Sequence, residues 1–348
     1  MNKLILLGNG FDLAHHLKTK YKDFILWYLY SSLKILIDEF KVSDELLSAN
    51  IGFRATSPPS LFKTIEEFNS FMKNYGIEFQ YSNKFFKQLI QKTAEQNWVD
   101  IESEYYFALL DLYKTLEKGN IDRHDRIDKE VKELNLCFDA IKTKLKEYLL
   151  TIENSNIEIN SNIAHHFIEE FGNQNTKNVG NVMFLNFNYT STVENYLNII
   201  SLNNKNVNYI HGKLNDPANP IIFGYGDEMD SYYTKIERLN SNEFLRNFKS
   251  FGYFKTKNYQ KLLSFLDSDK FHVYIMGHSC GISDRVLLNN IFEHKNCTHI
   301  QIFYHKTSET ENDFFEKTQE ISRQFKPESK SRMRRVIVPF TDSIPLVD

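Results

Sequence analysis

The feature that most constrains this chain is a short apolar stretch at its amino terminus, Lys3–Leu7, which ends at Gly8-Asn9-Gly10. A continuous apolar run of this length suits a strand buried on both faces better than an edge strand of alternating polarity. It therefore predicts the first strand of a parallel sheet, followed by a loop in which glycine permits a tight turn.

The pattern changes after this strand and changes back near residue 180. From Tyr21 to Phe171, apolar residues recur at helical spacing. After Gly180 short apolar runs return, separated by helical or irregular stretches: Val182–Leu185, Val207–Ile210, Ile221–Phe223, Val273–Met276, Ile300–Tyr304 and Val336–Val338. We expect an α/β fold with a mostly parallel sheet, in which residues 1–24 and 181–348 form the core and residues 25–180 form a large helical insertion.

Charge and cysteine content narrow the classes of partner. The 348 residues carry a formal net charge of -3, which gives no excess positive charge for binding nucleic acid. The three cysteines are too few and too scattered for a disulfide framework or a four-thiolate zinc site. No apolar run approaches the roughly 20 residues of a membrane helix, and no signal peptide is visible. We expect a cytoplasmic protein without a nucleic-acid, membrane or metal partner.

The loop after the first strand, Gly8–Asp12, has the composition of a phosphate-binding turn. Glycines here let the backbone approach a pyrophosphate at the start of a helix. The third glycine of the dinucleotide fingerprint is replaced by Leu13, so a plain tight turn is the alternative. Asp12 is expected either to cap the helix or to accept a hydrogen bond from a ribose hydroxyl.

Two further loops follow predicted strands, where ligands of an open α/β sheet bind. The run Asn186–Thr190 precedes a predicted helix over residues 192–200, so Asn188 or Thr190 is either a site residue or part of an Asx or N-cap arrangement. The pair His211-Gly212 offers an imidazole that exchanges a proton near neutral pH, and a purely structural histidine is the alternative.

The segment Gly277-His278-Ser279-Cys280-Gly281 matches the nucleophile-elbow pattern of serine hydrolases. In an elbow the helix begins at the serine, whereas here Ser283-Asp284 is expected to cap a helix over residues 286–294. A serine hydrolase would also need an acid and a histidine further along, for which Asp284 and His305 are candidates. We expect Ser279 to bind a ligand rather than to act as a nucleophile.

Taken together, these loops resemble the bacteriophage abortive-infection AbiH family. The resemblance spans almost the whole chain and rests on Leu6–His15, on Trp98 with Asp100 and Glu102, on Phe187–Thr190, on His211-Gly212, and on Gly277–Ser279 with Asp284. Four of these five elements also lie, in order, where sirtuin-like NAD-binding domains carry their nucleotide loops. This second, remote similarity implies a Rossmann-like fold that binds NAD as substrate or ligand.

The sirtuin-like similarity also implies a role for each loop. Asn188 and His211 match the asparagine and histidine that act at the nicotinamide ribose. The first loop, with Gly8, Asn9, Gly10, Phe11 and Asp12, would hold the pyrophosphate side, and Gly277, Ser279 and Asp284 would hold the adenosine end. Asn9 departs from the sirtuin pattern and the zinc module is lacking, so NAD cleavage is expected rather than protein deacetylation.

Two functions follow from these resemblances. The first is an anti-phage enzyme that hydrolyses the N-glycosidic bond of NAD or a related nucleotide. The second is a defence module that senses a nucleotide or a phage component without catalysis. In either case the helical insertion is expected to be a regulatory or oligomerising part, so a phage-derived trigger and a homo-oligomer are the partners left open.

Overall fold

The computed structural model describes residues 1–53, 62–96, 99–118, 124–153, 157–172, 180–200 and 204–347. The chain divides into two units. Unit 1 comprises Met1–Lys18, Ile152–Tyr233 and Phe248–Asp348, and unit 2 comprises Thr19–Thr151 and Thr234–Asn247.

The apolar runs of the sequence form a parallel sheet in unit 1. Its strands are β1 (Asn2–Leu7), β5 (Val182–Asn186), β6 (Lys205–Tyr209), β7 (Phe271–Met276), β8 (Cys297–Tyr304) and β9 (Ile344–Pro345). They lie in the order β6-β5-β1-β7-β8-β9, and every neighbouring pair is parallel. Counted along the chain this is third, second, first, fourth, fifth and sixth, which is the strand order of the Rossmann fold. The expected α/β fold with a parallel sheet is confirmed.

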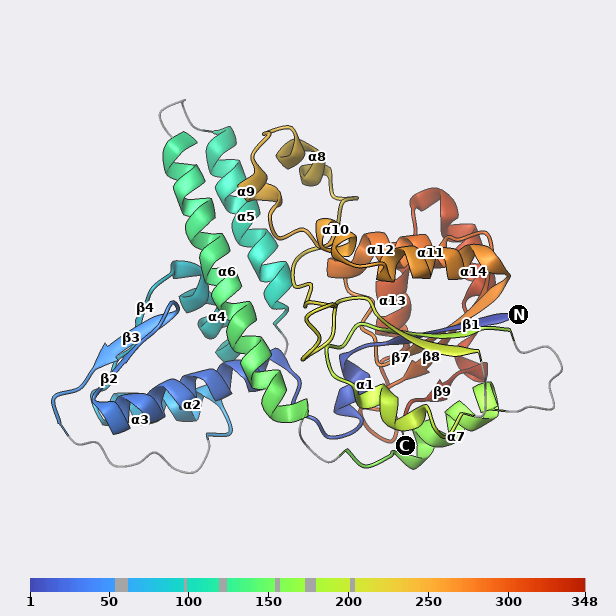
Figure 1. The fold of residues 1–348 in the computed structure, drawn as a ribbon, viewed down its shortest axis with the longest axis horizontal. Coiled ribbons are helices and arrows are strands. Elements are labelled where there is room, and N and C mark those ends of the chain that lie inside the picture. The colour runs from blue at the N-terminus through green and yellow to red at the C-terminus, as the bar shows by residue number, and fades with distance from the viewer. Residues whose placement is uncertain are drawn as a thin grey trace. The chain divides into compact units, whose positions relative to one another are not determined.

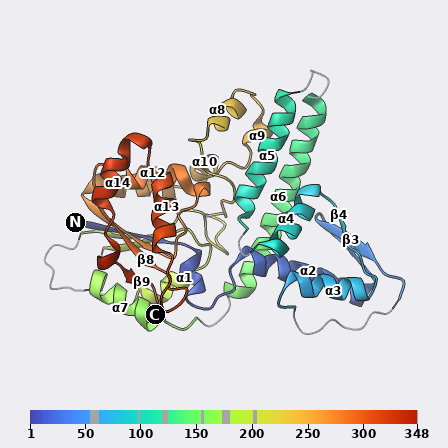
Figure 2. The ribbon, with the colours of Figure 1, turned by 180° about the vertical axis from the view of Figure 1, so that it is seen from behind.

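Both faces of this sheet are buried, which explains why its strands read as continuous apolar runs. Leu4 and Leu6 of β1 belong to a core on one face, which is covered by α11 (Asn258–Ser268), α12 (Arg285–Phe292), α13 (Phe314–Gln324) and α14 (Lys330–Val336). Ile5 and Leu7 belong to the core on the other face, which is covered by α1 (Asn9–Leu13), α7 (Ser161–Phe167) and a 3-10 turn, Thr192–Tyr196. Figure 1 shows α11, α12 and α14 on one side of the strands and α1 and α7 on the other, and Figure 2 shows the same layers from behind.

Short elements complete unit 1. They are a π-helical turn at Ile168–Gly172, α10 (Lys249–Gly252), and 3-10 turns at Tyr253–Lys255, Ile282–Asp284, Pro327–Ser329 and Phe340–Asp342. The helix α8 (Ser231–Glu237) begins in unit 1 and ends in unit 2.

Unit 2 is mainly helical, although it also contains a small sheet. Its helices are α2 (Tyr21–Glu39), α3 (Ile65–Asn74), α4 (Lys84–Glu95), α5 (Ile101–Glu117), most of α6 (His124–Glu153) and α9 (Asn242–Leu245). Its antiparallel sheet has the order β2-β3-β4, with β2 at Lys41–Ser43, β3 at Leu47–Asn50 and β4 at Gln80–Tyr81. The short polar strands of this sheet carry too little alternation to be recognised in the sequence.

The second unit ends earlier than the insertion expected from the sequence, residues 25–180. Its first segment ends at Thr151, its second segment is Thr234–Asn247, and the helix α7 belongs to unit 1. Ile163 and Phe167 of α7 are buried in the same core as Phe184 of β5, so this helix is part of the layer that covers the sheet.

Three of the expected secondary-structure elements are wrong. Ile221–Phe223 is buried but irregular, because its backbone bonds to a loop: the Ile222 amide donates to the His211 carbonyl at 2.7 Å. Val336 ends α14, and only Ile337 forms a bridge to Ile300 of β8. The expected helix over residues 192–200 is the 3-10 turn Thr192–Tyr196.

Side chains cap several helices. Asp100 precedes α5 and accepts from the Glu102 amide at 3.0 Å and from the Ser103 hydroxyl at 2.7 Å, which gives this motif residue a capping role. Glu102 is buried in the first turn of the same helix, whereas Trp98 lies outside the described residues.

No helix among the described residues is both long enough and apolar enough to cross a membrane.

Candidate functional site

The strand order of unit 1 places a crevice position between β1 and β7, where the sheet order reverses. The loops after these two strands touch through their backbones. The Gly10 amide donates to the Gly277 carbonyl at 2.8 Å, and the Gly8 amide donates to the Met276 carbonyl at 3.3 Å. The two loops that were expected to share a site are therefore joined at the carboxyl edge of the sheet.

Glycine is needed for this contact. Gly277 has φ +73°, and a Cβ added to it would lie 2.1 Å from the Phe11 nitrogen. A Cβ on Gly8 would lie 2.5 Å from the Cα of His278, and one on Gly10 would lie 2.8 Å from the Cα of Gly277. These glycines let two loops of the protein approach each other, and the tight turn expected as an alternative is part of that arrangement.

The loop after β5 joins the same place. Its Asx turn is made by Asn186, which accepts from the Asn188 amide at 3.0 Å and donates to the Thr190 carbonyl at 3.1 Å. The Asn188 side chain is partly buried and donates to the Gly8 carbonyl at 3.0 Å. Asn188 therefore ties the loop after β5 to the loop after β1.

Asp12 is buried beside this loop and does not cap α1, which has Gly8 at its N-cap. Its Oδ2 accepts from the Thr190 hydroxyl at 2.7 Å, while Oδ1 has no hydrogen-bond partner among the described residues. Burial raises the pKa of Asp12 to about 6, against the lowering effect of the hydrogen bonds from Thr190 and Thr192. Its neighbour Phe11 is also buried, with its ring in the core on the α7 face.

His211 is buried at the end of β6, and its Nε2 faces two polar groups. The Oδ1 atom of Asp284 lies 3.2 Å away, and the Tyr253 hydroxyl lies 3.3 Å away. Burial and the positive charge of Lys249 lower the pKa of His211, although Asp284 acts in the opposite direction. The imidazole is therefore neutral at neutral pH.

Asp284 is the centre of a buried group of charges. Its Oδ1 lies 2.7 Å from the Nζ of Lys249, and its Oδ2 lies 3.7 Å from the Nε2 of His278. Burial alone would raise the pKa of Asp284, but Lys249 and His211 hold it well below its usual range. Burial lowers the pKa of His278 to about 3, so the carboxylate is balanced by Lys249.

Sequence reasoning placed Asp284 with Ser279 and missed Lys249, Tyr253 and His278. The structure instead places the Asp284 carboxylate at His211. Nothing local marks Lys249 as special, because it begins a helix of only four residues, α10, and reads in the sequence like any surface lysine. His278 could have been noticed, since it directly follows Gly277 at the end of β7.

An aromatic ring, Phe187, links the loop after β5 to the buried group of charges around Asp284. The Phe187 ring lies 4.0 Å from the His278 ring and 5.1 Å from the His211 ring, centroid to centroid. The loops that carry Gly8, Asn188, His211 and Gly277 are thus brought together, as the sequence predicted.

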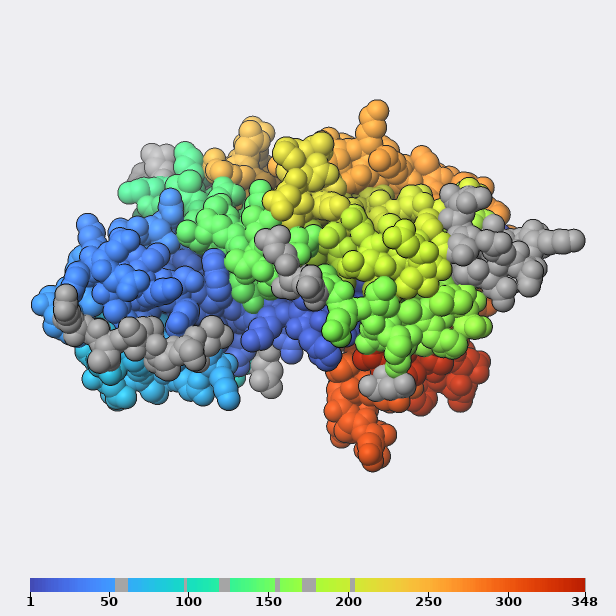
Figure 3. All heavy atoms as spheres, turned by 60° about the horizontal axis from the view of Figure 1, so that its bottom comes forward, coloured from blue at the N-terminus to red at the C-terminus, as the bar shows by residue number. Residues whose placement is uncertain are grey.

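Ser279 is exposed on the loop after β7, and α12 begins six residues later at Arg285, after the 3-10 turn Ile282–Asp284. This is not the geometry of a nucleophile elbow, in which the helix starts at the serine. His305, the histidine considered for such a triad, begins the exposed segment 305–311, which forms the orange-red projection at the bottom of Figure 3.

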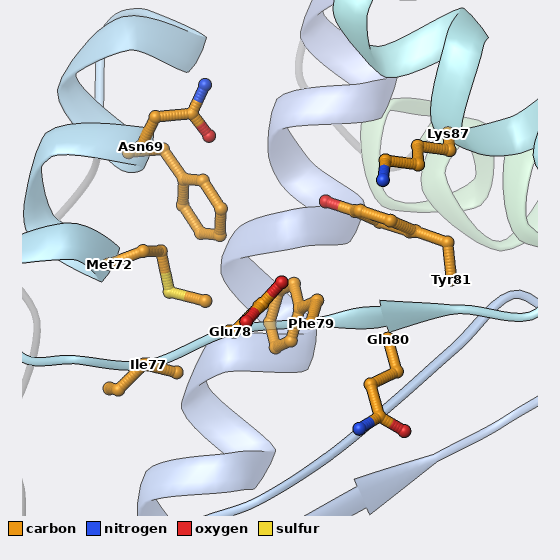
Figure 4. Close-up of a pocket in the computed structure, with 9 residues that line it drawn as sticks. Asn69, Met72, Ile77, Glu78, Phe79, Gln80, Tyr81 and Lys87 are labelled. Atoms are coloured by element: carbon orange, nitrogen blue, oxygen red, sulfur yellow. The ribbon is translucent and has the colours of Figure 1, made fainter.

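Unit 2 contains a pocket of about 340 Å³ that the sequence did not indicate. Its buried apolar wall comes from Phe68, Met72, Ile77 and Phe79, and its remaining lining residues are Asn69, Glu78, Gln80, Tyr81 and Lys87 (Figure 4). Groups of three or more histidine, cysteine, aspartate or glutamate side chains that could hold a metal are not found among the residues described.

Comparison with known protein families gives a match over most of the chain. The family model described as bacteriophage abortive infection AbiH matches residues 4–306. That range includes most of β1, the whole of unit 2 and every loop of the candidate site. Comparison with curated proteins gave no match. The chain therefore belongs to the bacteriophage abortive infection AbiH family.

Proposed function

We propose that this protein binds NAD or a related nucleotide at the carboxyl edge of its parallel sheet and hydrolyses the N-glycosidic bond of that nucleotide. Membership of the AbiH family supports a role in abortive infection by phage. The observation that carries the finer proposal is the strand order, because the loops of Gly8 and Gly277 follow the two strands at the switch point, β1 and β7, and Asn188 is bonded to Gly8 there.

In this proposal the loop Gly8–Asp12 faces the pyrophosphate, and within it Asn9 begins α1. The Gly10 amide of this loop is hydrogen-bonded to the Gly277 carbonyl, so it has a partner within the protein. Ser279 is exposed beside Gly277 and is the polar side chain available to the adenosine end. Asp284 is buried and would act on the ligand through its contact with His211.

The chemistry requires little from the protein. The C–N bond breaks with its electron pair going to the nicotinamide nitrogen, so the positively charged ring leaves as a neutral molecule without a general acid. Water then adds to the oxocarbenium-like ribose and loses a proton. Asn188 would orient the water or a ribose hydroxyl, and His211 would accept the proton.

The charge state of His211 suits this role, because a base must be unprotonated before it acts. Burial and Lys249 lower the pKa of His211, which keeps its imidazole neutral near pH 7. The Tyr253 hydroxyl lies 3.3 Å from Nε2, so a substrate hydroxyl would reach this nitrogen by replacing it.

A sensing module without catalysis is the alternative, and one feature favours it. Asn188 and the Gly10 amide have partners within the protein, and His211 is buried. Polar groups that are buried and hydrogen-bonded within the protein are what a site without catalysis also needs. Incubation of the protein with NAD, before and after phage challenge of the expressing cells, distinguishes the two: release of nicotinamide supports the hydrolase, and nucleotide binding with intact NAD supports the sensor.

A further inference from the structure

We infer that Lys249 is a positioning residue for His211: through the carboxylate of Asp284 it fixes the place of that imidazole in the site. The inference rests on the proposed function, in which His211 is the base. It adds a residue at the start of the short helix α10, far in sequence from the motifs of the site.

The contacts form a chain of three side chains. The Lys249 side chain is 1% exposed, and its Nζ lies 2.7 Å from Oδ1 of Asp284. The same oxygen atom lies 3.2 Å from Nε2 of His211. An ammonium group is buried to this extent only when a partner compensates its charge, so the lysine and the carboxylate hold each other in place.

The backbone around Lys249 is built for this contact. The Lys249 amide donates to the Tyr225 carbonyl at 2.9 Å, and the Val286 amide donates to the Gly226 carbonyl at 3.3 Å. A Cβ on Gly226 would lie 2.6 Å from the Ser283 oxygen and 3.5 Å from the Cδ of Lys249. The segment with Gly226 therefore lies between the start of α12 and the lysine stem, where a side chain would not fit.

Several groups face His211 and decide its protonation. They are Lys249 on α10, Asp284 before α12, the Tyr253 hydroxyl, and His278, whose own pKa is depressed. Lys249 lowers the pKa of His211 and Asp284 raises it. Removing the lysine charge should therefore raise the pKa of His211, both directly and because the carboxylate loses its closest cation.

The test is a titration of His211 by NMR in the full-length protein labelled at histidine, with the signal assigned by its loss in His211→Gln. In Lys249→Met the titration should move to higher pH. In Lys249→Arg, which keeps the charge, it should stay close to that of the wild type. If Lys249→Met does not fold, Lys249→Gln replaces it, because its amide can still donate to Asp284 while the charge is lost.

A matched control is Lys317→Met. Lys317 donates to the His278 carbonyl at 2.9 Å. Its substitution therefore removes a cation close to His278 and leaves the contact between Lys249 and Asp284 intact. The titration curve of His211 in Lys317→Met should match that of the wild type. An unchanged titration in Lys249→Met, or an equal shift in Lys317→Met, would overturn the inference.

The same variants are then assayed for nicotinamide release from NAD between pH 5 and 9. Lys249→Met should lose a larger share of wild-type activity at pH 6 than at pH 8, because His211 would be protonated at the lower pH. A merely structural lysine would lower activity equally across this range. If wild-type protein leaves NAD intact, the proposed function fails while the NMR titration still tests the link between Lys249 and His211.

Discussion

The two halves of the candidate site are held together by different means. In the first half, Gly8, Gly10 and Gly277 let the loops meet through close backbone contacts, and the Asn188 side chain adds a hydrogen bond to the Gly8 carbonyl. In the second half, made of Lys249, Asp284, His211 and His278, buried charged and titratable side chains hold the loops. The first half should be sensitive to the size of a side chain, and the second half to its charge.

The largest effect is expected in the second half, from Lys249→Met. This change leaves Asp284 buried without its closest cation, which costs about 3–5 kcal/mol in the free energy of unfolding. Chemical denaturation measures it, with Lys261→Met on the exposed side of α11 as the control. The double variant Lys249→Met/Asp284→Asn should lose less than the sum of its two single changes. Additive losses would show that the two side chains do not act as a pair.

A smaller loss, of about 3 kcal/mol, is expected in the first half from Gly277→Ala. A methyl group there meets the Phe11 nitrogen, and the residue has φ +73°. Gly281→Ala is a matched control in the same loop, because its nearest neighbour would be the Ser279 hydroxyl at 3.6 Å and its φ is -66°. If both substitutions cost the same, the close contact of the two loops is not what requires glycine.

Asp12 predicts a dependence of stability on pH. Its pKa in the folded protein is about 6, above its ordinary value of 3.8, so the folded state binds this proton more tightly than the unfolded state does. Wild-type stability from this group is therefore present below about pH 4 and is lost as the pH rises to about 6. Asp12→Asn should gain about 1–3 kcal/mol over the wild type at pH 8 and little at pH 4. An equal difference at both pH values would contradict the burial of an ionised carboxylate.

The smallest effect is expected for Ser279→Ala. The side chain is exposed on a loop, so stability should change by less than about 0.5 kcal/mol. A fluorophosphonate should leave no adduct on the wild-type protein, because the helix begins six residues after the serine rather than at it. Labelling at Ser279 would bring back the serine-hydrolase interpretation.

The same comparison explains how much the sequence could predict. The sheet and the loops of the first half were predictable, because buried parallel strands read as apolar runs and glycines mark their ends. The sequence of Ile221–Phe223 predicts a strand that does not form, because burial without hydrogen bonding to the sheet leaves the same apolar signal. Lys249 could not be found at all, because its pairing with Asp284 spans 35 residues and no local pattern encodes it.

If the loops of the candidate site act on a nucleotide, the most direct measurement is nicotinamide release from NAD by purified protein. Wild-type protein from phage-infected cells should release nicotinamide. Asn188→Ala and His211→Gln should each reduce the rate by roughly 10²–10⁴-fold, and the double variant should be about as slow as either alone, because residues that act as one unit are not additive. Melting curves accompany the assay, since loss of a buried hydrogen bond at His211 costs about 1–3 kcal/mol by itself. Intact NAD after incubation with the wild type, alongside loss of phage protection by Asn188→Ala at unchanged stability, would contradict the hydrolase and leave the sensing module.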